Sequence, residues 1–195
     1  MPELNNQNFN HLKIHTQYSI CEGAIKIDNL KDFCKEKKIP CLGLSDTSNL
    51  CGALEFAENI SKVGTQPIIG TQIYFRFEDT TGLLPLIALN EIGYKRIIEL
   101  SSRSYLENDA LSDPHLDIKE LLVDTEGVSL LSGTIQGLFG KLFEKGRLDE
   151  ISKLYKSLSS KFNDNFYLEI QRHGDQNEIA FEKFNLEQSL KIKIP

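Results

Sequence analysis

The sequence predicts an α/β fold with a mainly parallel sheet in a barrel-like arrangement. Strand-like and helix-like segments alternate along the 195 residues, and hydrophobic residues make up 40% of the chain, as in ordinary globular proteins. Strand, helix, strand in series implies right-handed crossovers between parallel strands. Polar side chains gather at the C-terminal ends of such strands. His15, Asp46 and Gln72 lie at or near predicted strand ends, so we expect a site there.

Each element of the first half has its own local pattern. Asp28 is a predicted N-cap, with Leu30, Phe33 and Cys34 on one helix face, and Gly64 closes the second helix. Apolar runs rich in Ile, Leu and Val mark the buried strands. The predicted strands are residues 11–15, 39–46, 66–70, 72–77 and 83–89, and the predicted helices are residues 28–38, 52–64 and 91–105.

The second half continues the alternation after an acidic loop and a short helix. Its elements are a strand at 128–133, two helical segments within 135–161, a strand at 166–171 and a helix at 177–190. The final "LKIKIP" resembles the earlier "KEKKIPCLGLSD", in which a helix leads through "KKIP" into a strand. We therefore expect residues 1–195 to be one N-terminal domain of a longer protein, with the last strand beyond Pro195. The alternative is a natural end with a frayed tail.

Composition argues against a membrane or secreted protein. The longest nearly unbroken apolar run, residues 83–89, is far too short to cross a bilayer. The N-terminus "MPELNNQNFN" lacks a basic segment followed by an apolar one, so a cytoplasmic location is expected. The four cysteines form no C-x-x-C pair and are predicted to be free thiols, mostly buried.

The net charge of −6 also bears on partners. Residues 107–126 contain seven acids and one lysine. Such a surface repels a phosphate backbone, since non-specific nucleic-acid affinity comes mostly from Lys and Arg. Strong direct binding of nucleic acid by this domain is not expected. The acidic stretch is either an ordinary solvated face or a docking surface for a partner protein.

Six motifs occur in order along the chain: "FNHLKIHTQYSICEGA", "LGLSDTSNLCGALEF", "PIIGTQIYF", "LLPLIALNEIGYKRIIELSS", "EGVSLLSGTIQG" and "FYLEIQRHG". Together they resemble the polymerase and histidinol phosphatase (PHP) domain, in particular the form at the N-terminus of bacterial DNA polymerase III alpha subunits. The resemblance implies a distorted seven-stranded β/α barrel, C-terminally truncated in this chain. Active members hold three metal ions at the strand ends. It also implies a parent chain that is a DNA-directed DNA polymerase, a nucleotidyltransferase of DNA replication.

The family's metal ligands can be carried over to positions of this chain. The H-x-H-[ST] motif corresponds to Lys13, Ile14, His15 and Thr16, so its first histidine is replaced by lysine. The acidic ligand that follows in the family corresponds to Glu22. The family's "TDHG" falls on residues 45–48, which places Asp46 at the aspartate and Thr47 at the histidine ligand.

Three further ligand positions are also substituted. The carboxylate of "GCE" corresponds to Gln72, a histidine to Leu83, and a cysteine to Thr134. A closing D-x-H motif is expected beyond Pro195. Hydroxyl and amide oxygens are poor replacements for imidazole, thiolate or carboxylate donors. An ammonium group about 4 Å from a divalent ion costs a few kcal/mol even at an effective dielectric near 20.

Only His15 and Glu22 retain metal-binding chemistry, which predicts a degenerate site with no bound metal and no catalytic residues. Zinc or manganese, or else magnesium, is expected only if the site is active after all. We hypothesise that Lys13 replaces the missing cation by pairing with Asp46 or Glu22, because an uncompensated buried carboxylate is costly. The alternative is that Lys13 simply reaches solvent.

These patterns favour a non-catalytic structural and docking domain. Its expected partners are the rest of the polymerase chain and a separate proofreading exonuclease subunit. The alternatives are an active metal-dependent phosphoesterase or 3′–5′ exonuclease working through metal-activated water, and a histidinol-phosphatase-like enzyme. The substituted ligands argue against both alternatives.

Overall fold

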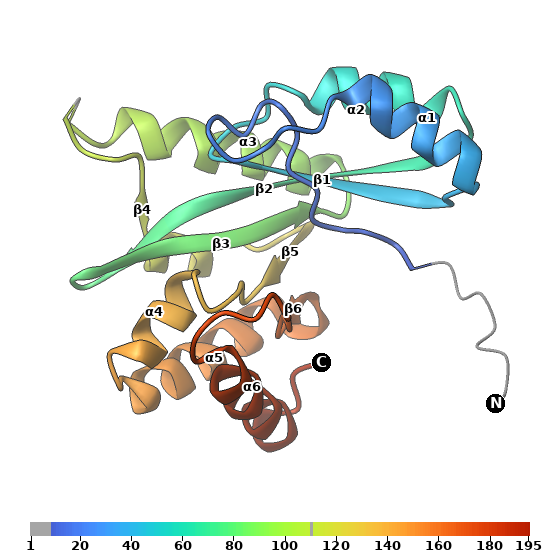
Figure 1. Ribbon diagram of the computed structural model, residues 1–195. Helices are drawn as coiled ribbons and strands as arrows, with labels where there is room; N and C mark the ends of the chain where they lie inside the picture. Colours follow the sequence, from blue (N-terminus) through green and yellow to red (C-terminus); the bar gives the residue numbers. More distant parts are fainter. Residues whose placement is uncertain (1–8, 110) are drawn as a thin grey trace, which may run out of the picture. The chain divides into compact units, whose positions relative to one another are not determined.

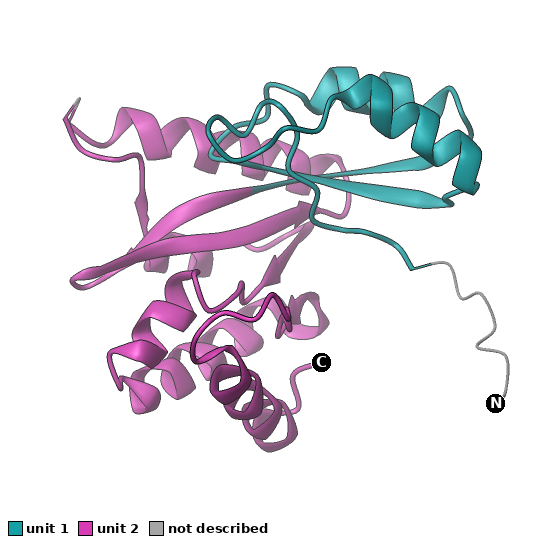
Figure 2. Ribbon diagram, in the orientation of Figure 1, with its two compact units in different colours: residues 1–71 teal, residues 72–195 magenta. Residues whose placement is uncertain are grey.

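A computed structural model describes residues 9–109 and 111–195 (Figure 1). The chain divides into two units, residues 1–71 and 72–195 (Figure 2). It passes from the first unit to the second within strand β2 (Gln66–Phe77). Each unit is described by itself.

The first unit contains two helices and the strand between them, α1 (Ile27–Lys37), β1 (Cys41–Thr47) and α2 (Ala53–Ser61). The helices contact each other, as Figure 1 shows, and their apolar faces meet β1 in one core. Ile27, Leu42, Leu44 and Phe56 are almost completely buried in this core. The core therefore fixes β1, which carries two of the candidate site residues at its C-terminal end.

The second unit contains the rest of the sheet and most of the helices. Its elements are β3 (Thr80–Ala88), α3 (Glu91–Leu106), β4 (Leu116–Asp117), the 3₁₀ helix η1 (Ile118–Leu122), β5 (Val128–Leu131), α4 (Leu138–Glu144), α5 (Leu148–Phe162), the 3₁₀ helix η2 (Asn163–Asn165), β6 (Phe166–Tyr167) and α6 (Glu178–Ile192). Tyr155 of α5 is fully buried, with its ring edge-on to Phe139 and Phe166. This aromatic group joins α4 and α5 to β6.

The α/β class is confirmed, but the sheet is mixed and open. β1 neighbours β2 in the first unit, and the second unit continues in the order β2-β3-β5-β6, with β4 beside β2. β3 and β5 run antiparallel, whereas β2–β4 and β5–β6 are parallel. The expectation of parallel neighbours therefore holds for β2–β4 and β5–β6 and is wrong for β3–β5. Among the described strands this path has two ends, so the expected seven-stranded barrel is not closed.

Several element boundaries also differ from the prediction. Residues 66–70 and 72–77 form one continuous strand, β2. Residues 11–15 make an isolated parallel bridge, Ile14 with Leu44, instead of a full strand. β6 stops at Tyr167 because the next backbone N–H groups bond elsewhere, Leu168 to the Pro195 carbonyl at 2.8 Å and Glu169 to the Ser132 hydroxyl at 2.9 Å. In the described part of the chain, no helix combines the length and apolarity needed to cross a bilayer.

Two smaller expectations need correction. Lys26 occupies the N-cap position of α1, and Asp28 lies within the first turn of that helix. All four cysteines are free thiols, as expected, but only Cys34 is buried.

Candidate functional site

The positions carried over from the metal-site pattern fall into both units. Lys13, His15, Glu22, Asp46 and Thr47 belong to the first unit, and Gln72, Leu83 and Thr134 belong to the second. Each group has its own local contacts.

The bridge between Ile14 and Leu44 sets which side chains share a face in the first unit. Both residues pack into the core formed with α1 and α2. Side chains alternate along an extended chain, so Thr16 and Asp46, two residues further on, lie on this core face. His15 and Thr47 lie on the opposite face, and so does Lys13. The carried-over positions are thus divided between the two faces of β1 and its neighbour.

The Asp46 carboxylate is fully buried and has hydrogen-bond donors for both oxygens. Oδ1 accepts from the Thr16 backbone N–H at 2.6 Å and from the Ser19 hydroxyl at 2.7 Å. Oδ2 accepts from the Thr16 hydroxyl at 2.7 Å. A carboxylate removed from water is tolerated when such donors replace its hydration. Three neutral donors therefore bind Asp46, and the pairing of Lys13 with Asp46 or Glu22 stays a prediction.

Neighbouring groups close the space around Asp46. The Thr71 hydroxyl donates to the Asp46 carbonyl at 2.6 Å. A Cβ placed on Gly52 would lie 2.6 Å from the Tyr18 ring and 3.3 Å from Asp46 Oδ2, so only glycine fits there. The Tyr18 hydroxyl donates to Glu55 at 2.6 Å, and this bond raises the pKa of Tyr18.

The opposite face holds the residues that retain metal-binding chemistry. The Glu22 carboxylate accepts a hydrogen bond from the Thr47 hydroxyl. His15 Nδ1 and the Ser45 hydroxyl are buried and have no hydrogen-bond partner among the described residues. Across residues 9–109 and 111–195, no three His, Cys, Asp or Glu side chains are grouped so that they could hold a metal ion. His15 and Glu22 thus have no third ligand of these types.

The three positions in the second unit also lack strong metal donors. Gln72 is buried in β2, and Leu83 lies in β3. A Cβ added at Gly137 would lie 2.9 Å from the Leu83 carbonyl and 3.2 Å from the Thr134 carbonyl. The backbones of Leu83 and Thr134 therefore both lie next to Gly137. The Thr134 hydroxyl accepts from the Gln136 backbone N–H at 3.2 Å. Leu83 and Thr134 therefore lie close together, with a hydrocarbon and a hydroxyl as their side chains.

The binding of Asp46 by Thr16 and Ser19 is not predicted by the sequence pattern. The available signal was "HTQYS", in which two hydroxyl residues follow the segment paired with β1. Thr16 was considered only as part of the metal motif. The register of that segment against β1 was needed to place its hydroxyl beside Asp46.

The mixed α/β fold resembles that of PHP phosphoesterases. The structure is similar to that of a protein from Bifidobacterium adolescentis assigned as a metal-dependent phosphoesterase, with a TM-score of 0.59 and 13% sequence identity. The similarity covers 95% of this chain and 84% of the other, and it establishes the fold alone. A model of the PHP domain family matches residues 11–173. The chain belongs to the PHP family.

Its sequence relatives are polymerase subunits. The chain is 37% identical over 191 residues to DNA polymerase III subunit alpha of Caulobacter vibrioides, covering 93% of this chain and 17% of the relative. It is 31% identical to the same subunit of Vibrio cholerae, covering 96% and 16%. The matched part is the N-terminal region of these subunits. The chain thus spans about one sixth of the length of the relatives it matches.

Proposed function

We propose that residues 1–195 are the N-terminal PHP domain of a DNA polymerase III alpha-like chain, which acts in the cytoplasm in DNA replication. In this proposal the domain is a non-catalytic structural and docking module with a degenerate metal site. The sequence similarity to the N-terminal regions of alpha subunits supports the polymerase context. DNA synthesis itself would belong to other parts of the chain.

One observation carries the non-catalytic role. The metal-ligand positions that can be compared hold an amine at Lys13, a hydroxyl at Thr47, an amide at Gln72 and a hydrocarbon at Leu83. Metal-activated water requires a cation held by several carboxylate, imidazole or thiolate donors. The Glu22 carboxylate also already accepts a hydrogen bond from Thr47. Two remaining ligands, one of them hydrogen-bonded, favour a site without a catalytic metal.

The experiment measures metal content and hydrolysis together. The purified full-length chain is expected to contain no stoichiometric zinc, manganese or iron. It should release no phosphate from a phosphomonoester, and remove no 3′ nucleotides from DNA, in added manganese. A variant that restores the family ligands, Lys13→His, Thr47→His, Gln72→Glu, Leu83→His and Thr134→Cys, serves as the matched positive control. This variant should gain bound metal if the five positions are correctly assigned.

Two or three transition metals per wild-type chain would overturn the non-catalytic role. Manganese-dependent hydrolysis that is lost in a Glu22→Gln, His15→Ala variant would instead establish the phosphoesterase or exonuclease alternative.

We also propose that chain beyond Pro195 completes the sheet toward the family's barrel. Ile194 is buried, and the Pro195 carbonyl accepts a hydrogen bond from the Leu168 backbone, directly after β6. The last residues therefore lie where a strand next to β6 would begin.

The docking role is proposed for a proofreading exonuclease subunit. The acidic stretch of residues 107–126 exposes apolar side chains among its carboxylates, including Leu111 and Val123. Pull-down of the exonuclease with the full-length chain tests this role. The triple substitution Asp113→Asn, Asp117→Asn, Asp124→Asn is expected to weaken capture, whereas Glu36→Gln and Glu58→Gln in the first unit should leave it unchanged. Undiminished capture by the triple variant would remove the acidic stretch from the docking site.

A further inference from the structure

Helix α6 buries several polar side chains and exposes several apolar ones. Its buried residues are Glu178, Phe181, Asn185 and Gln188, three of them polar. A surface helix normally turns its apolar stripe toward the core. The Asn185 Nδ2 and Gln188 Oε1 atoms are buried, with no hydrogen-bond partner among the described residues. The inward face of α6 is therefore an unusually polar one.

Three apolar residues of α6 lie on its outward face, whereas Phe181 is buried on the inward face. Ile179 is 83% exposed, Leu186 47% and Leu190 85%. Their spacing of seven and then four residues places them on one stripe along the helix. Single exposed apolar residues are ordinary, but an aligned stripe on one helix is typical of an interface.

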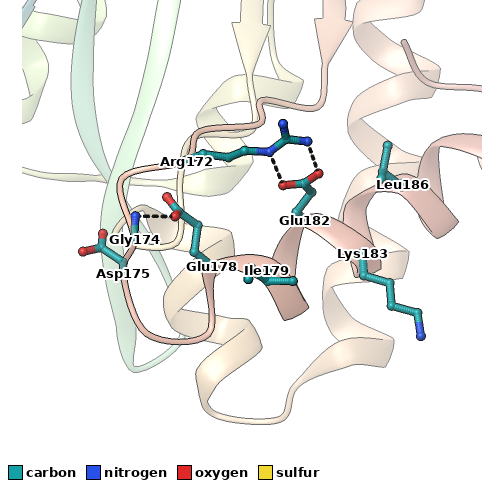
Figure 3. A pocket seen from close by; sticks show the side chains of 8 residues that line it. All are labelled: Arg172, Gly174, Asp175, Glu178, Ile179, Glu182, Lys183 and Leu186. Carbon is teal, nitrogen blue, oxygen red and sulfur yellow. Dashed lines mark hydrogen bonds and ion pairs between the residues drawn. The ribbon is translucent and has the colours of Figure 1, made fainter.

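A groove adjoins the N-terminal part of this stripe, and hydrogen bonds hold several of its lining residues in place (Figure 3). It has a volume of about 540 Å³ and is lined in part by Arg172, Ile179, Glu182 and Leu186. The Arg172 guanidinium donates to both oxygens of Glu182, at 2.9 and 2.6 Å. The Glu178 carboxylate accepts from the backbone N–H groups of His173 and Gly174, each at 2.9 Å. These bonds hold the preceding loop against the first turns of α6.

We propose that the outward stripe of α6, formed by Ile179, Leu186 and Leu190, is seated against a later segment of the same polymerase chain. This proposal rests on the proposed function. The relatives matched by this chain extend over more than four fifths of their length outside the matched N-terminal region. α6 is the last helix of the sequence, so chain that follows Pro195 starts close to the C-terminal end of this stripe.

The size of the stripe favours a tethered segment over a second copy of the chain. α6 has 15 residues, which makes a helix about 22 Å long and about 10 Å wide. One face of such a helix is smaller than the roughly 800 Å² per partner that a standard stable interface buries. A segment of the same chain is held nearby at a high effective concentration, so a small apolar contact is enough to keep it in place.

The test compares two matched leucines in the full-length chain. Leu190 is 85% exposed in the last turn of α6, and Leu106 is 82% exposed at the end of α3. Each is replaced separately, Leu190→Cys or Leu106→Cys, and alkylation by iodoacetamide is followed by peptide mass spectrometry. A covered thiol reacts only when its cover opens, so we expect alkylation at position 190 to be at least about tenfold slower than at position 106.

Equal alkylation rates at the two positions would overturn the inference. Protection at position 190 that increases with protein concentration would assign the stripe to a second copy, and this result would overturn it as well. Protection of position 190 from alkylation only after a partner protein is added would also overturn the inference. If the gene encodes no polymerase segment after Pro195, the proposed function itself fails. If that segment is present and the rates are equal, only this inference fails.

Discussion

The surroundings of Asp46 and the inward face of α6 both bury polar side chains, but they satisfy them differently. Asp46 has three hydrogen-bond donors at 2.6–2.7 Å, all from Thr16 and Ser19. Asn185 and Gln188 each retain a buried polar atom without a partner among the described residues. Buried polar groups are almost always hydrogen-bonded, and each exception calls for an explanation.

The difference is that the Asp46 carboxylate finds its donors within the first unit, whereas the inward face of α6 retains polar atoms without a partner among the described residues. Thr16 and Ser19, which are close to each other in the sequence, donate the hydrogen bonds that stabilise the buried negative charge of Asp46. In α6, polar atoms of Asn185 and Gln188 lack a partner among the described residues, and Leu186 and Leu190 are exposed. Both features are consistent with the proposal that another segment packs against this helix. The predictions below test this difference, starting with the largest effect.

Asp46→Ala should be the most destabilising of these changes. It leaves two hydroxyls and one backbone N–H without their acceptor in a fully buried place, at a cost of about 3 kcal/mol or more. Urea unfolding followed by circular dichroism measures the loss in free energy of unfolding. Asp28→Ala on the exposed face of α1 is the control, with an expected change below about 0.5 kcal/mol. Equal midpoints for the two variants would show that the Asp46 network contributes little.

Glu178→Gln should have a smaller effect that depends on pH. Hydrogen bonds from the His173 and Gly174 backbone lower the pKa of Glu178 in the folded state. A lowered pKa stabilises the fold above the unfolded value of about 4.3, and the contribution is lost as the pH falls through the folded value.

The melting temperature of the wild type should therefore exceed that of Glu178→Gln at neutral pH and converge with it toward about pH 3. Glu187→Gln, on the exposed side of α6, is the control that should follow the wild-type curve. A constant difference between Glu178→Gln and the wild type at every pH would contradict the assignment.

Gln188→Leu should have the smallest effect, and in the opposite direction. Replacing a buried amide that lacks a partner by an apolar side chain of similar size removes a desolvation cost, so we expect stabilisation of up to about 1 kcal/mol. Gln136→Leu at an exposed position is the control and should leave the melting temperature unchanged. Destabilisation by Gln188→Leu would mean that the amide oxygen has a partner in solution, such as an ordered water.

The helices could be predicted well from the sequence, because their apolar spacing and closing residues are local signals. The predicted helices at 28–38, 52–64 and 91–105 each agree with α1, α2 and α3 to within three residues. The direction of β5 was not predictable in this way. It pairs antiparallel with β3 across a connection of about forty residues, whose path no local pattern determines.

The candidate site was predictable in position but not in arrangement. β1 is buried on both faces, so its sequence lacks the polar–apolar alternation that would have placed Asp46 on the core face. α6 presents a related difficulty, because its polar and apolar residues are not segregated in the usual direction, and only the packing shows which face is inward.

The alternation of side chains along β1 has a consequence for how such a domain can change over generations. The residues that keep the strand folded, Asp46 with Thr16, lie on one face, and Lys13, His15 and Thr47 lie on the other. Ligands on the second face can be exchanged without disturbing the hydrogen bonds of the first. The chemistry of the second face can therefore vary, one residue at a time, while the scaffold is conserved.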